Sequence, residues 1–138
     1  MIWMLSVLSI RGIAQTKTID SLRNKVLHSS SAAQRKENIL QMLNQQRSLS
    51  SDTIWSYIQQ LSKTIPPKDT ISQIKKQQYT AYYYFRTAQL DTALHIVNQT
   101  INYATTYKIK QRVLDEISFL KVAILLKKNN HKGYSIHS

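Results

Sequence analysis

The sequence predicts an all-α fold built from helical hairpins, and three observations carry the prediction. Two glycines and two prolines among 138 residues are too few for the many tight turns of an all-β domain. Over residues 74–104, apolar and small residues recur at steps of three and four, as in helices that bury one face. In addition, Ser51-Asp52-Thr53 is followed by Leu90-Asp91-Thr92 at a step of 39 residues, which indicates an internal repeat.

Residues 77–104 and the turn of helix before them carry the clearest hairpin pattern. The segment 87–90 joins two predicted helices, and Asp91 and Thr92 are available to cap the second one. The inward positions of the first helix are Ile74, Gln78, Ala81, Phe85 and Ala88, and those of the second are Ala93, Val97, Thr100, Ile101 and Ala104.

Residues 1–14 have the form of a signal peptide. The apolar run 1–10 is too short to span a bilayer as a helix, and Gly12-Ile13-Ala14 offers small residues where a signal peptidase cleaves. Cleavage after Ala14 would export the chain to the periplasm or cell envelope. No basic residue precedes the run and Arg11 follows it, so the alternative is a first helix packed on the repeats of a cytoplasmic protein.

Three helices are predicted between the signal peptide and the hairpin. Residues 18–27 form a short capping helix that faces inward with Ile19, Leu22, Val26 and Leu27. Residues 32–49 form the next helix, with Ile39, Leu40, Met42 and Leu43 on its buried side. Residues 54–65 follow after a turn at 50–52. Pro66-Pro67 ends this helix and marks a boundary between repeats, because proline can neither continue a helix nor leave the preceding residue free to do so.

A further helix is predicted after the hairpin, over residues 109–127. Its inward positions are Val113, Ile117, Leu120 and Ile124. Asn129-Asn130 should turn the chain. The second helix of a third hairpin should then begin near Tyr134. A repeat array that ended there would leave apolar surface uncovered. Region 15–138 is therefore expected to be a piece of a longer protein, and the chain is expected to self-associate or fray from Ile109 onward.

The hairpin resembles a tetratricopeptide repeat. Ala81 and Tyr84 stand at the family's small and aromatic positions of its first helix, and Leu90 and Ala93 stand at the first-turn and small positions of its second. A step near forty exceeds the usual 34 and is similar to the long-loop repeats in exported sensor regions of bacterial two-component kinases and related regulators. The resemblance, which covers the chain from about residue 39 onward, implies hairpins stacked as a short solenoid and a protein-interaction role.

Catalytic and metal-binding patterns are absent from the sequence. Asp52, Asp69 and Asp91 each precede a threonine at a predicted helix start, where they are expected to cap helices. Asp115 and Glu116 are adjacent and point about 100° apart on a helix, so they cannot act as a dyad. The four histidines form no His-x-x-x-His pair, the chain has no cysteine, and its only two glycines form no phosphate loop. No enzyme, metal site or cofactor is predicted within these residues.

The charge of +12, from 19 basic and 7 acidic residues, suits several partners. Nucleic acid is one, because phosphate neutralisation and tyrosine stacking would use this composition. The lysines, however, are spread over every helix as on a solvated surface. An acidic peptide or protein, or an anionic membrane surface, is therefore preferred as the partner.

The run Tyr82-Tyr83-Tyr84-Phe85 suggests a binding groove. Neighbouring residues of a helix point in different directions, so Tyr82 and Phe85 are expected inside the hairpin, Tyr84 between repeats, and Tyr83 toward solvent or a groove. The alternative is that all four serve packing. The residues expected to line a peptide groove are Gln77, Thr80, Tyr83, Arg86 and Gln111.

Two functions follow from these observations. The first is a non-enzymatic protein–protein interaction scaffold, the sensory or input region of a bacterial signalling protein. The second is a basic all-α nucleic-acid-associated protein of the cytoplasm.

Overall fold

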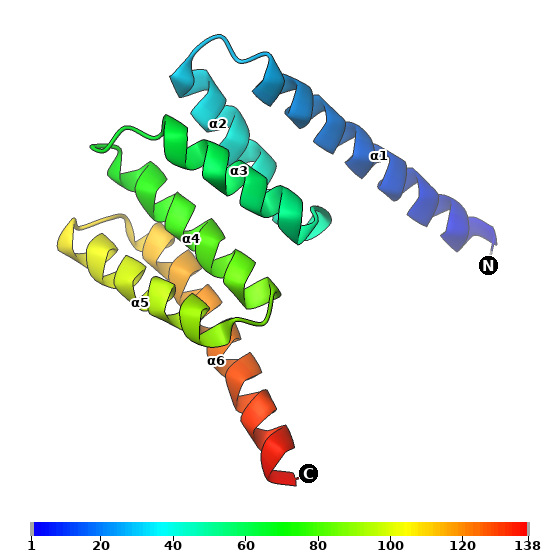
Figure 1. The fold of residues 1–138 in the computed structure, drawn as a ribbon. Coiled ribbons are helices and arrows are strands. Elements are labelled where there is room, and N and C mark those ends of the chain that lie inside the picture. Colours follow the sequence, from blue (N-terminus) through cyan, green and yellow to red (C-terminus); the bar gives the residue numbers. More distant parts are fainter. Residues whose placement is uncertain (1, 138) are drawn as a thin grey trace. The chain divides into compact units, whose positions relative to one another are not determined.

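A computed structural model describes the backbone of residues 2–137 and the side chains of residues 15–130. Within these described residues the chain forms six α-helices and one short 3-10 helix, with no strand, which confirms the prediction of an all-α fold built from helical hairpins. The chain divides into two compact units at Pro66, residues 1–65 and 66–138, where the sequence predicts a boundary. Figure 1 shows the helices of each unit.

The first unit contains α1 (Ile2–Leu27), α2 (Ala32–Leu43), the 3-10 helix η1 (Gln46–Ser48) and α3 (Ser51–Thr64). α2 packs against both α1 and α3. The four residues predicted for the inner side of α2 are all buried, together with residues of α1 and α3; the core of the unit comprises Leu22, Val26, Ile39, Leu40, Met42, Leu43, Leu49, Ile54, Tyr57, Ile58, Leu61 and Ile65.

Two predictions for the first unit are wrong in detail. The helix predicted over residues 32–49 ends at Leu43, because residues 44–48 are all polar and the 3-10 turn instead returns Leu49 to the core. The predicted capping helix 18–27 is the last part of the longer α1, and its Leu27 is 68% exposed rather than inward. The predicted signal peptide falls on residues whose side chains lie outside the described part, and it stays a prediction.

The second unit contains α4 (Thr70–Arg86), α5 (Leu90–Thr106) and α6 (Gln111–His137). α4 and α5 form the predicted antiparallel hairpin, and α6 packs against both helices (Figure 1). One core joins the three helices, formed by Ile74, Ala81, Ala93, Val97, Ala104, Ile117 and Ile124. Most of the predicted inward positions are therefore correct, but Ala88 is exposed.

The burial pattern of α3 recurs in α5 at the predicted step of 39 residues. The two helices begin at Ser51 and Leu90, which are 39 positions apart. Four of the five residues buried in α3 and at its end have a buried counterpart 39 residues later, in the pairs Ile54 and Ala93, Ile58 and Val97, Leu61 and Thr100, and Ile65 and Ala104. The exception is Tyr57, whose counterpart Ile96 is half-buried. The repeat of sequence is thus also a repeat of burial.

The aspartates predicted as caps differ in their roles. Asp69 caps α4, since its carboxylate accepts hydrogen bonds from the backbone N–H and the hydroxyl of Ser72. Asp52 lies in the first turn of α3, and the cap is Ser50, whose hydroxyl accepts from the N–H of Thr53. Asp91 lies in the first turn of α5, where a negative charge also suits the helix dipole.

α4 and α5 end in the same way, with a non-glycine residue at positive φ. Ala88 has φ 63° and Lys108 has φ 52°. After each of them the next N–H donates to a carbonyl five residues back, Gln89 to Tyr84 at 2.8 Å and Ile109 to Ala104 at 3.0 Å. These are Schellman motifs, in which glycine is the usual residue at the left-handed position. The left-handed conformation explains why Ala88 leaves the buried face.

α6 does not turn at Asn129-Asn130 as predicted, and no separate helix opens near Tyr134. The described backbone remains helical to His137, because neither asparagine is followed by the glycine or proline that commonly ends a helix. Lys127 and Lys128 anchor this helix at the α4–α5 turn. The Lys127 ammonium lies 3.4 Å from the carbonyl oxygen of Phe85 and 4.8 Å from its ring centroid, while Lys128 pairs with Asp91 at 2.6 Å.

The aromatic residues of α4 pack differently from the prediction. Tyr84 and Phe85 contact the core of the second unit, whereas Tyr82 is half-buried beside Phe85 at a ring separation of 6.3 Å. The buried tyrosine is Tyr79, which is 8% exposed. Burial raises the pKa of Tyr79 from 10.0 to about 12, and the negative charge of Glu116 on α6 adds to the increase.

Replacing Ala88 with glycine should stabilise the protein. The left-handed conformation costs a residue with a Cβ about 1–2 kcal/mol. Glycine avoids this cost, but it lowers stability by about 0.4–1 kcal/mol because it makes the unfolded chain more flexible. Ala88→Gly should therefore raise the free energy of unfolding by about 0.5–1 kcal/mol in urea titrations followed by circular dichroism. The control is Ala33→Gly in α2, at an exposed helical position, which should lower it by about 0.5 kcal/mol. A loss of stability in Ala88→Gly would contradict the assignment.

Stability should fall at high pH through Tyr79. Below pH 10 the phenol is protonated in both the folded and the unfolded state, but between pH 10 and 12 only the unfolded state ionises freely, so unfolding becomes more favourable. A pKa difference of this size corresponds to about 2–3 kcal/mol. Tyr79→Phe should remove this part of the pH dependence in urea titrations, and Tyr107→Phe, at a 57% exposed ring, should keep it. If the wild type and Tyr79→Phe lose the same unfolding free energy between pH 10 and 12, ionisation of Tyr79 does not cause the loss.

Candidate functional site

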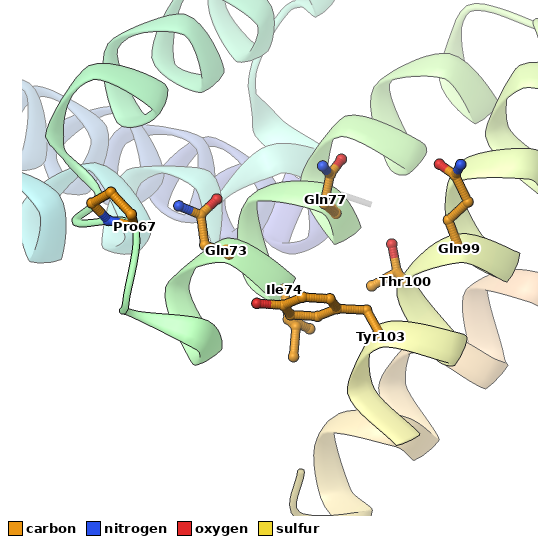
Figure 2. A pocket seen from close by; sticks show the side chains of 7 residues that line it. All are labelled: Pro67, Gln73, Ile74, Gln77, Gln99, Thr100 and Tyr103. Atoms are coloured by element: carbon orange, nitrogen blue, oxygen red, sulfur yellow. The ribbon is translucent and has the colours of Figure 1, made fainter. Parts of the chain in front are cut away.

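A pocket of about 370 Å³ opens between α4 and α5. Figure 2 shows that Gln73, Ile74 and Gln77 come from α4 and that Gln99, Thr100 and Tyr103 come from α5, with the Tyr103 ring projecting toward α4. Pro67, just before α4, closes the lining. The volume lies at the lower end of the range for ligand sites, roughly 300–1,000 Å³, and would hold one side chain with its adjoining backbone.

The lining combines an apolar floor with uncharged polar groups. Ile74 is 1% exposed and Tyr103 is 36% exposed, so an isoleucine and the face of a tyrosine ring form the apolar part. Each glutamine amide supplies one acceptor oxygen and two N–H donors. The Thr100 hydroxyl donates to the carbonyl of Ile96 at 2.7 Å, which leaves its oxygen as an acceptor. The pocket thus matches a neutral ligand that has both donors and acceptors.

Helical geometry explains why these residues share one pocket. Gln73 and Gln77 stand four residues apart, as do Gln99 and Tyr103, so each pair lies on one face of its helix. The two helices run antiparallel and bring the pairs face to face. The side chains of these pairs are longer than the alanines of the hairpin core. The amide ends of Gln77 and Gln99 lie near solvent, since both residues are exposed.

Of the five residues predicted to line a groove, only Gln77 lines this pocket. The Thr80 hydroxyl donates to the Lys76 carbonyl at 2.7 Å, and the Tyr83 ring packs edge-on against Tyr84 with centroids 5.3 Å apart. Arg86 is exposed at the end of α4. Gln111 begins α6 and donates to Asp115 at 2.9 Å. The α4–α5 pocket therefore includes one of the five residues, and the groove lined by all five stays a prediction.

Sequence reasoning missed Gln73, Gln99 and Tyr103 as members of a site. Thr100 and Ile74 are predicted on the inner faces and are buried there, but the periodicity alone does not identify them as the floor of a pocket. The signal that could have located the site is the spacing of the glutamines at i and i+4 on one helix, opposite a glutamine and a tyrosine at i and i+4 on the next.

The first unit has a more open depression between α1 and α2. It mixes charges of both signs, since Lys17, Lys25 and Asp20 all line it. The Asn38 amide donates to the carbonyl of Lys25 at 3.1 Å and to the hydroxyl of Ser29 at 3.0 Å. These bonds hold the α1–α2 turn against α2, so the polar side chains there serve to join the two helices.

The acidic residues of α6 form ordinary surface contacts. Asp115 accepts from Gln111, and Glu116 lies 3.8 Å from Arg112 in an exposed ion pair. Among the described residues, no three histidine, cysteine or acidic side chains are grouped so that they could hold a metal ion. Within the same residues, no helix has the length and hydropathy needed to cross a membrane.

Comparisons with family models, curated proteins and solved structures found no match to this chain.

Proposed function

We propose that the chain is a non-enzymatic scaffold that binds an extended peptide segment of a partner protein in the pocket between α4 and α5. The observation that supports this most directly is the uncharged, amide-rich lining over an apolar floor. An extended peptide offers the complementary pattern, since its backbone N–H and C=O groups are free to pair with the glutamine amides.

The binding mode follows from the lining. One apolar side chain of the peptide would lie on Ile74 and the Tyr103 ring, where it would be removed from water. The peptide backbone beside it would exchange hydrogen bonds with Gln77 and Gln99, which stand across the pocket from each other. Tyrosine is well suited to this role because it offers a large apolar surface and few rotatable bonds.

Charge favours an acidic segment around that apolar side chain. The second unit carries eleven lysine and arginine residues against four aspartate and glutamate residues, a net charge of +7. The pocket itself contributes no charge, so the attraction comes from the surrounding surface. Such a field speeds the encounter with an acidic partner and weakens as salt is added.

The resemblance to tetratricopeptide repeats supports a role as the sensory or input region of an exported bacterial signalling protein. The residues that carry the resemblance contribute to the packing of the hairpin. Ala81 and Ala93 are fully buried, and Tyr84 and Leu90 pack against the same core. The 39-residue recurrence of burial in α3 and α5 also suits a repeat.

The alternative is a basic nucleic-acid-associated protein of the cytoplasm, and the net charge of +12 is the observation in its favour. Two of the lysines that suggested it, Lys127 and Lys128, are engaged at the α4–α5 turn. Binding of a DNA or RNA oligonucleotide with a steep dependence on salt concentration would favour this alternative. A mature N-terminus at Gln15 would exclude it.

The peptide-binding proposal can be tested with labelled acidic peptides that each contain one central leucine or phenylalanine. Fluorescence anisotropy should detect binding to the wild-type chain. The double variant Gln77→Ala/Gln99→Ala should weaken it by roughly tenfold, because two net hydrogen bonds of about 0.5–1.5 kcal/mol each are lost. Both positions are exposed, so the fold should be unaffected.

The matched control is Gln111→Ala, which removes a glutamine from α6 outside the pocket. It should bind the peptides as the wild type does. Equal weakening in the control and the double variant would contradict the pocket, and the absence of binding by any peptide of the set would contradict the scaffold.

A further inference from the structure

The floor of the α4–α5 pocket contains a buried hydroxyl whose hydrogen is already used. Thr100 is 4% exposed and lines the pocket. Its hydroxyl donates to the Ile96 carbonyl at 2.7 Å, so it can offer a ligand only the lone pairs of its oxygen. Figure 2 shows the Thr100 side chain extending from α5 toward α4, between Gln99 and Tyr103. A ligand that covers this oxygen without donating to it leaves a buried acceptor unpaired, which costs free energy.

The polar groups around Thr100 are rich in donors. Three glutamines line the pocket, Gln73, Gln77 and Gln99, and each amide has two N–H donors for one acceptor oxygen. The ligand group that suits this surrounding both donates and accepts, as a hydroxyl does, whereas an indole N–H or an ammonium group only donates. Among the described residues that line the pocket none is charged, so an ammonium or carboxylate group would lose hydration there without gaining a counter-ion.

One wall of the pocket is an aromatic ring with a partner of its own. The Tyr103 ring lies 4.6 Å from the Tyr107 ring, centroid to centroid, and it projects toward α4 beside Ile74 (Figure 2). Aromatic rings pair favourably with one another in addition to the area that they bury. An aromatic side chain also fills more of the 370 Å³ than an aliphatic one does, and unfilled space forfeits contacts with the walls. The pocket therefore favours an aromatic ring that carries a hydroxyl.

We infer that the side chain bound in this pocket is a tyrosine of the partner peptide, and that Thr100 is the residue that selects it. This selection rests on the proposed peptide binding, of which the tyrosine is the anchor. The ligand ring lies on Ile74 and against the Tyr103 ring. Its hydroxyl donates to the Thr100 oxygen and accepts from a glutamine N–H. Phenylalanine would make the same ring contacts but would leave the Thr100 oxygen unpaired.

The experiment uses three labelled acidic peptides that differ only in the central residue, which is tyrosine, phenylalanine or O-methyltyrosine. In fluorescence anisotropy the wild-type chain should bind the tyrosine peptide roughly five- to tenfold more tightly than the phenylalanine peptide, as the loss of one net hydrogen bond implies. O-methyltyrosine keeps the ring and the oxygen but has no hydrogen to donate, so it should bind no more tightly than phenylalanine.

Thr100→Val tests the selecting residue, because valine keeps the branched shape and removes the acceptor oxygen. This variant should bind the tyrosine and phenylalanine peptides equally, whereas Thr100→Ser, which keeps a hydroxyl, should retain the preference for tyrosine. The matched control is Thr105→Val. Thr105 is exposed outside the pocket, and its hydroxyl likewise donates to the carbonyl four residues back, that of Ile101, at 2.8 Å. The control removes an equivalent bond of α5 and should keep the preference.

The outcomes separate the anchor from the peptide binding on which it rests. Equal wild-type affinity for the tyrosine and phenylalanine peptides, with both weakened by Gln77→Ala/Gln99→Ala, would overturn the tyrosine anchor and leave the proposed function standing. A preference that persists in Thr100→Val, or that is also lost in Thr105→Val, would overturn the role of Thr100. Absence of binding by all three peptides would overturn the proposed function and the anchor with it. The wild-type comparison needs no variant, so it decides the anchor even if Thr100→Val is unstable.

Discussion

The close contact between α4 and α5 is the constraint on which the second unit depends. Ala81 on α4 and Ala93 and Ala104 on α5 are fully buried in one core. Side chains this small allow two helices to approach at the short end of the usual separation, about 8 Å. The hairpin then presents one continuous apolar surface, on which Ile117 and Ile124 of α6 pack. A larger residue at any of these alanines would separate the two helices and disrupt the apolar surface on which α6 packs.

The same hairpin positions the pocket and α6. The pocket lies between α4 and α5 because the antiparallel register brings Gln77 opposite Gln99, and Ile74 beneath them is held by the core. Ile117 and Ile124 fix the rotation of α6 on the hairpin, and the Lys127 and Lys128 contacts at the α4–α5 turn support it. The pocket can therefore be altered at its exposed residues without changing the core.

The part of the fold that could be predicted from sequence is the part governed by periodicity. Proline chemistry located the division at Pro66, and the steps of three and four identified the buried sides of α2, α4 and α5. The step of 39 residues anticipated the matching burial of Ile58 and Val97. Periodicity works for these features because an amphipathic helix can bury only one face.

Features governed by three-dimensional contacts could not be predicted in this way. Polar residues follow both Leu43 in α2 and Lys128 in α6, yet α2 ends and α6 continues. At the end of α2 the outcome depends on Leu49, which reaches the core only if the helix stops. Among the adjacent aromatic residues of α4, the rotation of the helix against α6 buries Tyr79 and leaves Tyr82 half-buried. The pocket was missed because its lining joins residues that are close only across the hairpin.

The most direct test of this account is the unfolding free energy of Ala93→Leu, compared with Ala33→Leu as a control at an exposed helical position of α2. If the close α4–α5 contact holds the second unit together, Ala93→Leu should overpack it and lose about 1–3 kcal/mol, while Ala33→Leu should change the stability by less than about 0.5 kcal/mol. Wild-type stability in Ala93→Leu would show that the helices do not meet at this alanine, and would contradict the account.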